Sequence, residues 1–187
     1  NNESTRYGGG LHVDKWGYVN IVNTTFSGNE ADRGGAIAFS GVDDINLPDN
    51  TILHSTITGN TANIAGGGLF LEAAGFYRPA LDLNGSIVSG NTAGSGDEIH
   101  DEHFGVSSSN NVLSDAAKAT AAAFLGFTPD ASDFDASNDA GNVAIGAILN
   151  TTLADNGGPT LTHLLVDLSP ALDAAPSADC AIAPVSG

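Results

Sequence analysis

A motif that returns every 31 residues is the strongest constraint on the fold of this chain of 187 residues. Residues 25–29 read Thr-Phe-Ser-Gly-Asn, residues 56–60 read Thr-Ile-Thr-Gly-Asn, and residues 87–91 read Ile-Val-Ser-Gly-Asn. A short polar stretch and a glycine-rich cluster follow each copy. A fixed period of this length is typical of solenoids, in which each repeat buries its apolar face only against its neighbours.

The residues before each Gly-Asn pair predict short β-strands that end at tight corners. β-branched and aromatic residues are frequent in residues 18–26, 51–57 and 81–88, with an alternating pattern. Glycine and asparagine accept the positive φ that a tight corner requires. We expect the repeated asparagines to stack from coil to coil, each amide bonding to the next. The predicted ladder consists of Asn29, Asn60 and Asn91, with the corner glycines Gly28, Gly59 and Gly90.

The repeat resembles a known family of bacterial surface proteins. Phe26-Ser27-Gly28-Asn29 followed by Gly34-Gly35-Ala36-Ile37 is similar to the FxxN and GGAI pair of polymorphic outer-membrane proteins. The second copy departs from this pattern at Ile57, and the third keeps only Ser89-Gly90-Asn91. The resemblance covers about residues 8 to 100. It implies an all-β, right-handed parallel β-helix on or outside the cell.

Charge and composition exclude several classes of function. The chain has 22 Asp+Glu against five Lys+Arg, which gives a formal net charge of −17. A field this negative repels phosphate groups, so we expect no nucleic acid partner. No apolar run approaches the ~18 residues of a transmembrane helix, so we expect no membrane insertion. One cysteine, Cys180, rules out an internal disulfide and leaves a free or a buried thiol open.

The second half is expected to close the same domain. We predict β-helix coils over residues 1–106 and further C-terminal coils over 107–187. A short inserted α-helix near 115–125 is predicted from Ser114 as N-cap, an alanine-rich body and Gly126 as stop. Asp-Asn-Gly-Gly-Pro-Thr-Leu-Thr-His at 155–163 and Ser-Pro-Ala-Leu-Asp at 169–173 resemble late segments of large secreted β-helix proteins. There we expect a turn at 155–159 and a strand over 160–166, and both chain ends look like cuts within a longer protein.

Two acidic clusters suggest metal sites. Asp133, Asp135 and Asp139 offer the oxygen ligands that calcium prefers, although their spacing is not that of an EF-hand. His100 and His103 lie among carboxylates, as in some transition-metal sites, but no third ligand can be named. A solvated surface loop is the alternative in both cases. Calcium is therefore the only cofactor that the sequence suggests.

Polysaccharide chemistry is the alternative to a structural role, since some parallel β-helices are polysaccharide enzymes. A lyase would use Arg78 as its base, whereas a hydrolase would pair two carboxylates about 5–9.5 Å apart. With 22 acids in the chain, such a pair is expected by chance. The hydrolase candidates are Asp43, Asp44, Asp49 and Asp82. Carbohydrate stacking would use exposed aromatic rings, of which Trp16 and Tyr77 are the main candidates beside Tyr7, Tyr18 and Phe76.

The sequence thus predicts an extracellular bacterial β-helix that serves as a structural or adhesive module rather than as an enzyme. Truncated coils at both termini suggest end-to-end self-association into a homo-oligomer or filament. A glycan or a host or cell surface is the other expected partner. These statements about function are expectations from the resemblance and the charge.

Overall fold

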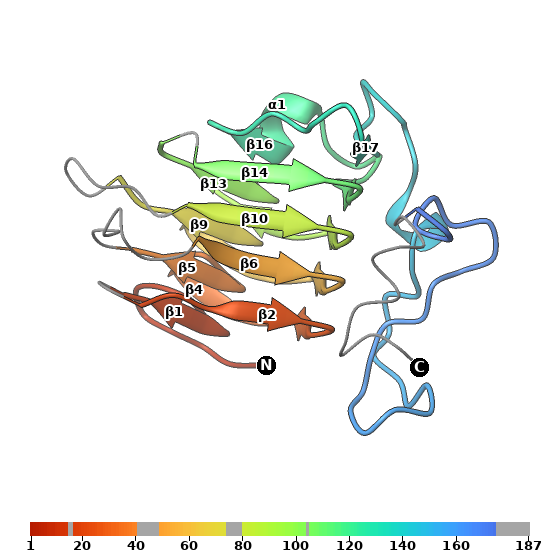
Figure 1. Cartoon of the computed structure of the whole chain (residues 1–187), viewed down its shortest axis with the longest axis horizontal. Helices are drawn as coiled ribbons and strands as arrows, with labels where there is room; N and C mark the ends of the chain where they lie inside the picture. Colours follow the sequence, from red (N-terminus) through yellow and green to blue (C-terminus); the bar gives the residue numbers. More distant parts are fainter. Residues whose placement is uncertain (15–16, 41–48, 74–79, 104, 175–187) are drawn as a thin grey trace.

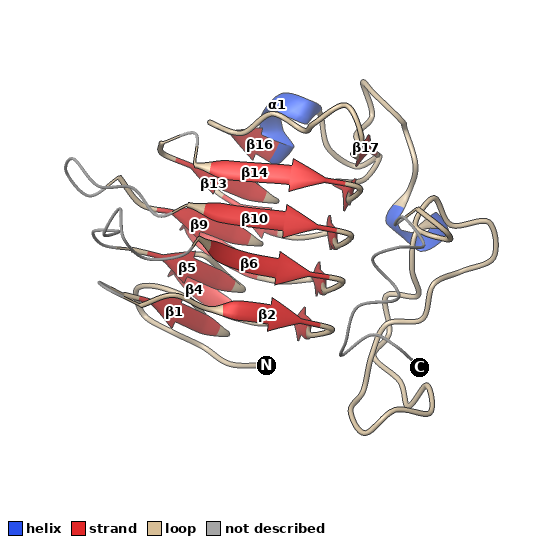
Figure 2. Cartoon of the chain, viewed as in Figure 1, coloured by secondary structure: helices blue, strands red, loops and turns tan. Residues whose placement is uncertain are grey.

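The chain folds into a stack of rectangular coils (Figure 1). This computed structural model describes residues 1–14, 17–40, 49–73, 80–103 and 105–174. Every strand pairing in the four sheets is parallel, and each strand pairs with its equivalents in the neighbouring coils. The all-β parallel β-helix predicted from the repeat is confirmed. Figure 2 shows how little helix it contains.

Each complete coil contributes one strand to each of four sheets. The first sheet contains β1 (Leu11–Val13), β5 (Ile37–Phe39), β9 (Leu69–Leu71), β13 (Ile99–Asp101) and β16 (Phe124–Leu125). The second contains β2 (Asn20–Val22), β6 (Asn50–Leu53), β10 (Leu81–Asn84) and β14 (Val106–Ser109). The third contains β3 (Thr25–Ser27), β7 (Thr56–Thr58), β11 (Ile87–Ser89), β15 (Val112–Leu113) and β17 (Phe134–Asp135). The fourth contains β4 (Glu30–Arg33), β8 (Thr61–Ala65) and β12 (Thr92–Ala93).

The core is a set of aliphatic columns inside the coils. Equivalent residues of successive coils align in register, as Phe26, Ile57 and Val88 do in the third sheet. Ile21, Ile52 and Leu83 form the matching column of the second sheet. One coil cannot enclose such a column alone, so each coil is stabilised by the apolar surface it buries against its neighbours.

At three of the four corners of each coil, the chain turns through a residue with a left-handed backbone conformation, that is, a positive φ. Between the second and third sheets it falls on Asn23, His54, Gly85 and Asn110, with φ between 49° and 57°. This corner divides residues 18–26, 51–57 and 81–88, each of which we expected to form one strand, into two strands. The other two corners use the glycines after the third and fourth sheets: Gly28, Gly59, Gly90, Gly34, Gly66 and Gly96. The fourth corner, between the first and second sheets, contains the longer connections of the coils.

The inserted helix is present but shorter than expected. It is the single turn α1 (Thr120–Ala123), at the end of the stack that Figure 1 shows above β13. Its N-cap is Ala119, so the interpretation of Ser114 as N-cap is wrong. Ser114 instead adopts φ 65° and is fully buried, beside the buried Asp115.

The chain after β17 leaves the stack. We expected coils up to residue 187, but within 136–174 the structure contains only the 3-10 turn η1 (Ile145–Ala147) and two isolated antiparallel bridges. The expected strand over 160–166 is therefore reduced to single bridge positions. We call residues 137–174 the arm. Ile148 and Leu149 of the arm pack on Ile87 and Val112, on the outer side of the third sheet.

Candidate functional site

The structure brings the three repeated asparagines into one buried, hydrogen-bonded column. Asn29 Nδ2 donates to Asn60 Oδ1 at 2.9 Å, and Asn60 Nδ2 donates to Asn91 Oδ1 at 2.9 Å. The backbone N–H of each residue donates to the same oxygen of the next coil, at 2.9 and 3.0 Å. Asn2 extends the column by one level, since its Nδ2 donates to Asn29 Oδ1 at 3.0 Å. Sequence reasoning missed Asn2 because no motif precedes it.

The asparagine column ends on a buried glutamate. Glu98 takes the position of the next asparagine and accepts from Asn91 Nδ2 at 2.7 Å and from Gly90 N at 2.9 Å. Its other partner is Lys118, whose Nζ lies 2.8 Å from Glu98 Oε1 and 2.9 Å from Asp115 Oδ2. We call Glu98, Lys118 and Asp115 the charged triad. It joins the third coil to the segment that closes the stack.

One ammonium group faces two carboxylates in the charged triad. Burial raises the pKa of Glu98 to about 7, against the opposing effects of Lys118 and the Asn91 donors. Burial also disfavours the charged form of Lys118, but the two carboxylates outweigh it and raise the pKa of the ammonium. Lys118 therefore stays charged, and the carboxyl group of Glu98 titrates near neutral pH.

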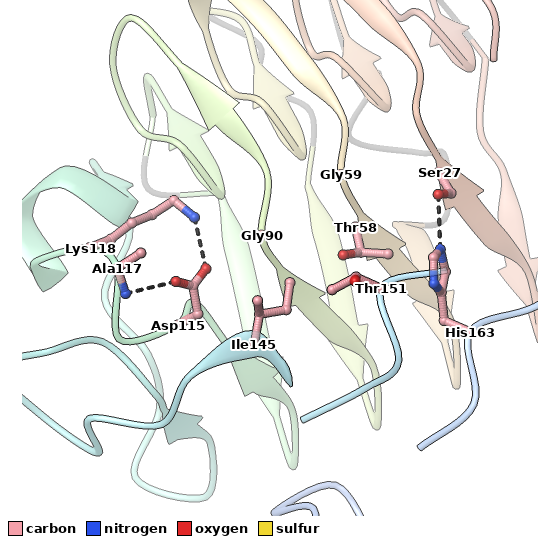
Figure 3. Close-up of a pocket in the computed structure, with 10 residues that line it drawn as sticks. All are labelled: Ser27, Thr58, Gly59, Gly90, Asp115, Ala117, Lys118, Ile145, Thr151 and His163. Atoms are coloured by element: carbon pink, nitrogen blue, oxygen red, sulfur yellow. Dashed lines mark hydrogen bonds and ion pairs between the residues drawn. The ribbon is translucent and has the colours of Figure 1, made fainter. Parts of the chain in front are cut away.

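A groove lies between the third sheet and the arm (Figure 3). It has a volume of about 360 Å³ and runs from the charged triad past Ile145 to His163. Polar groups line both ends, while Ile145 lies between them. The lining residues are Ser27, Thr58, Gly59, Gly90, Asp115, Ala117, Lys118, Ile145, Thr151 and His163.

His163, the last residue of the Asp-Asn-Gly-Gly-Pro motif segment, fastens the arm to the β-helix. Its Nε2 lies 2.9 Å from Ser27 Oγ, and its Nδ1 lies 2.8 Å from the carbonyl oxygen of Asn150. A carbonyl only accepts, so Nδ1 carries the proton and Nε2 accepts from the serine hydroxyl in the neutral ring. A serine beside an imidazole is also half of a nucleophile–base pair. Serine–histidine contacts also occur at His12 and His100 in the first sheet, so such a pair in this fold does not by itself indicate catalysis.

A second polar column runs along the corner between the second and third sheets. Ser55 N donates to Ser86 Oγ at 3.1 Å, Ser86 N to Asn111 Oδ1 at 2.8 Å, and Asn111 N to Asp133 Oδ1 at 2.9 Å. The sequence carries a signal for it, since Thr24, Ser55 and Ser86 are also 31 residues apart. We did not predict this column, because its residue type changes from coil to coil.

The three aspartates proposed for calcium each serve an internal hydrogen bond. Asp133 ends the second polar column and also accepts from Ser108 Oγ at 2.6 Å. Asp135 accepts from Thr120 Oγ1 at 2.9 Å, and Asp139 accepts from Thr120 N at 2.8 Å. No group of three or more His, Cys, Asp or Glu side chains that could hold a metal ion occurs in the described ranges.

The other predicted site residues are scattered or lie outside the described residues. His100 packs on Phe70 with ring centroids 5.4 Å apart, and His103 is buried and bonds to the carbonyl oxygen of Glu72, so the two histidines do not converge. Asp49 and Asp82 are exposed, Asp82 on the outer side of β10. The candidates Trp16, Asp43, Asp44, Phe76, Tyr77, Arg78 and Cys180 lie outside the described residues.

Comparisons with known proteins do not assign a family. No family model, curated protein or solved structure matches the chain. The resemblance to polymorphic outer-membrane protein repeats therefore stays a prediction from the sequence. Within the part of the chain that the structure describes, no helix has the length and apolar character to cross a membrane.

Proposed function

We propose that this chain is a structural module of an extracellular bacterial surface protein. The observation that carries the proposal is the asparagine column, which continues from Asn2 through Asn29, Asn60 and Asn91 to Glu98. Buried amides that satisfy one another fix the register of successive coils and resist sliding or bending. A rod with fixed register is suited to hold loops and sheet faces at a set distance from an anchor.

The distribution of polar groups supports the same role. Several buried polar side chains of the stack form two columns that follow the rod axis, and each column ends on an acid: Glu98 for the asparagine column and Asp133 for the second. The groove under the arm is lined partly by Asp115 and Lys118 of the charged triad, which form an ion pair with each other. These residues serve the stacking of the coils, which is the expected pattern for a scaffold.

Surface display tests the proposal. The chain is placed between a secretion signal and a bacterial surface anchor, with an epitope tag in the exposed arm turn at residues 155–159. A structural module keeps the tag accessible to antibody on intact cells and resists added protease. The Asn60→Ala variant, with a broken column, is the matched control and loses both properties. Release of reducing ends or unsaturated products from polysaccharides by the purified chain would show an enzyme instead and would overturn the proposal.

Self-association is a second property that one observation favours. β1, β2 and β3 are edge strands of their sheets among the described residues, so their outer backbone groups lack strand partners. α1 lies at the opposite end of the stack (Figure 1). If this segment occurs alone, we propose that copies pair through the β1–β3 end, in keeping with the homo-oligomer or filament expected from the sequence. Light scattering that shows only monomer at high concentration would contradict it.

A further inference from the structure

The glycine corner after the third sheet forms a column of small pits on the outside of the coils. Gly28, Gly59 and Gly90 are equivalent residues of successive coils, and all three have a positive φ between 66° and 76°. Because glycine has no β-carbon, each one leaves a space beside the backbone that another group can fill. At Gly90 the arm fills the pit, since Ile145 Cδ1 occupies the space that a β-carbon would need. At Gly28 the side-chain oxygen of Asn1 fills it.

The pit at Gly59, between these two filled pits, is open. Apart from its chain neighbours, no atom of the described residues lies within 4 Å of the position that a β-carbon on Gly59 would take. Gly59 lines the groove of about 360 Å³ between the third sheet and the arm, together with Ile145, Thr151 and His163 (Figure 3). The open pit therefore leads into a space large enough for an aliphatic side chain and its neighbouring backbone.

The filled pit at Gly90 indicates which chemistry the open pit accepts. Ile145 lies between Ala144 and Gly146, and such small neighbours let the backbone approach the corner closely. Ile145 also packs against the apolar cluster that holds the arm on the third sheet. An isoleucine flanked by small residues is therefore a side chain that fits a pit of this column.

We propose that the groove at Gly59 is the docking site of this chain's own C-terminal segment, residues 175–187, with Ile182 in the open pit. The segment follows the arm in the sequence and lies outside the described residues. Its stretch Ala181-Ile182-Ala183 has the same small–isoleucine–small pattern as Ala144-Ile145-Gly146. In the docked segment the two isoleucines occupy neighbouring pits, one coil apart.

The described chain ends close to the groove. Ala171 packs against the same apolar cluster as Ile145, and the described residues end three positions later, at Ala174. Ile182 follows after eight further residues, and an extended stretch of eight residues spans up to about 26–29 Å. The segment can therefore reach the pit at Gly59 from the end of the arm.

The same chain is a better source of this segment than a second copy. A tethered segment acts at a high effective concentration, so it docks without a high intrinsic affinity. Two copies that each carry a net charge of −17 repel one another. The site is separate from the structural role proposed above, because the asparagine column is buried inside the coils and the pit opens outside them.

The reaction of Cys180 with a thiol reagent tests the site in the full chain. Cys180 is the single cysteine and lies two residues before Ile182, so docking covers its thiol. In the folded parent chain we expect a reaction at least about tenfold slower than in urea. The test variants are Ile182→Ser, which removes the aliphatic side chain, and Gly59→Asn, which fills the pit with a residue that tolerates a positive φ. Each should speed the reaction by about tenfold or more, because the docked state loses the burial of one aliphatic side chain.

Two matched variants control for the substitutions. Val185→Ser removes an aliphatic side chain from the same segment, and Gly157→Asn fills another open position with a positive φ, at the exposed turn of the arm. Both should react like the parent chain, and circular dichroism shows that all variants are folded. A parent rate equal to the rate in urea, an unchanged rate in Gly59→Asn, or equal acceleration in Val185→Ser would each overturn the proposal.

A cross-link tests the docking without any change at the pit. Thr151 is exposed and lines the groove, so a thiol-reactive cross-linker with a short spacer should join Thr151→Cys to Cys180 within one chain. Adding Ile182→Ser should lower the yield by about tenfold. Failure to link would overturn the proposal. Linked dimers in place of linked monomers would show that a second copy supplies the segment, which would also overturn docking within one chain.

Discussion

Replacing Asn60 by alanine tests the asparagine column where it is most buried. Asn60 is fully buried, and its side chain lies between those of Asn29 and Asn91. Its oxygen accepts from both the backbone N–H and the side-chain amide of Asn29, each at 2.9 Å. Its amide donates to Asn91 and also to the carbonyl oxygens of Phe26 and Thr58, both at 3.1 Å. Alanine removes all of these side-chain contacts.

The expected loss follows from the groups left without partners. The two Asn29 donors become unsatisfied, while Asn91 Oδ1 keeps the backbone N–H of residue 60. A buried polar group without a partner costs about 1–3 kcal/mol, so two such groups should lower the free energy of unfolding by about 2–6 kcal/mol. Asn2→Ala removes an equivalent bond to Asn29 at the exposed end, where water replaces the lost donor. We expect that variant to lose less than about 1 kcal/mol.

Urea unfolding followed by circular dichroism measures both variants. The decisive quantity is the ratio between the losses in free energy of unfolding of the two variants. Any effect of replacing asparagine on the unfolded chain is common to both variants. A loss below about 1 kcal/mol for Asn60→Ala, or equal losses at Asn60 and Asn2, would refute the idea that the column sets the register of the coils. Asn60→Asp should be worse than alanine, because it places an unpaired charge in the same buried position.

Three further predictions concern the ends of the polar columns and the arm. Glu98 has a folded pKa of about 7, above its usual 4.5, so its contribution to stability is lost as the pH rises through this window. Glu98→Gln should flatten that part of the stability–pH curve between about pH 5 and pH 8, and an unchanged slope would contradict the assignment. His163→Ala should release the arm from the third sheet, so proteases should cleave after residue 137 faster than in the parent chain. The free energy of unfolding should fall by less than about 1.5 kcal/mol. Equal cleavage rates in the variant and the parent chain would contradict the fastening role. Chelation should leave the melting temperature unchanged, whereas Asp133→Ala should lower it by removing the end of the second polar column. A lower melting temperature on chelation, with no effect of Asp133→Ala, would instead support the predicted calcium site.

The fold was predictable because its signal is periodic and local. The spacing of Asn29, Asn60 and Asn91 requires a coil of constant length, and Gly-Asn supplies the corner chemistry at each turn. The internal corner of each predicted strand was missed because Asn23, His54 and Gly85 share a conformation but not a residue type. The period alone identifies them, since they too are 31 residues apart.

The site features depend on contacts between residues far apart in the chain. Lys118 was expected to be a helix residue, but it precedes α1 and its ammonium group reaches Glu98, 20 residues earlier. His163 meets Ser27 across 136 residues, which no local pattern can reveal. Tyr7 was a candidate for carbohydrate contact from its residue type. Arg33 Cζ lies 5.8 Å from the centre of the Phe70 ring, a contact across 37 residues that no local pattern can reveal.

The constant coil length also makes this rod easy to lengthen or shorten. Removal of residues 60–90 would join Gly59 directly to Asn91, and Asn29 would meet Asn91 at the spacing at which it now meets Asn60. The same cut keeps every left-handed corner in phase, because each has an equivalent one coil away. Unequal recombination between such repeats would therefore yield folded descendants that differ by whole coils, so the reach of the module can change in steps without redesign of its interior.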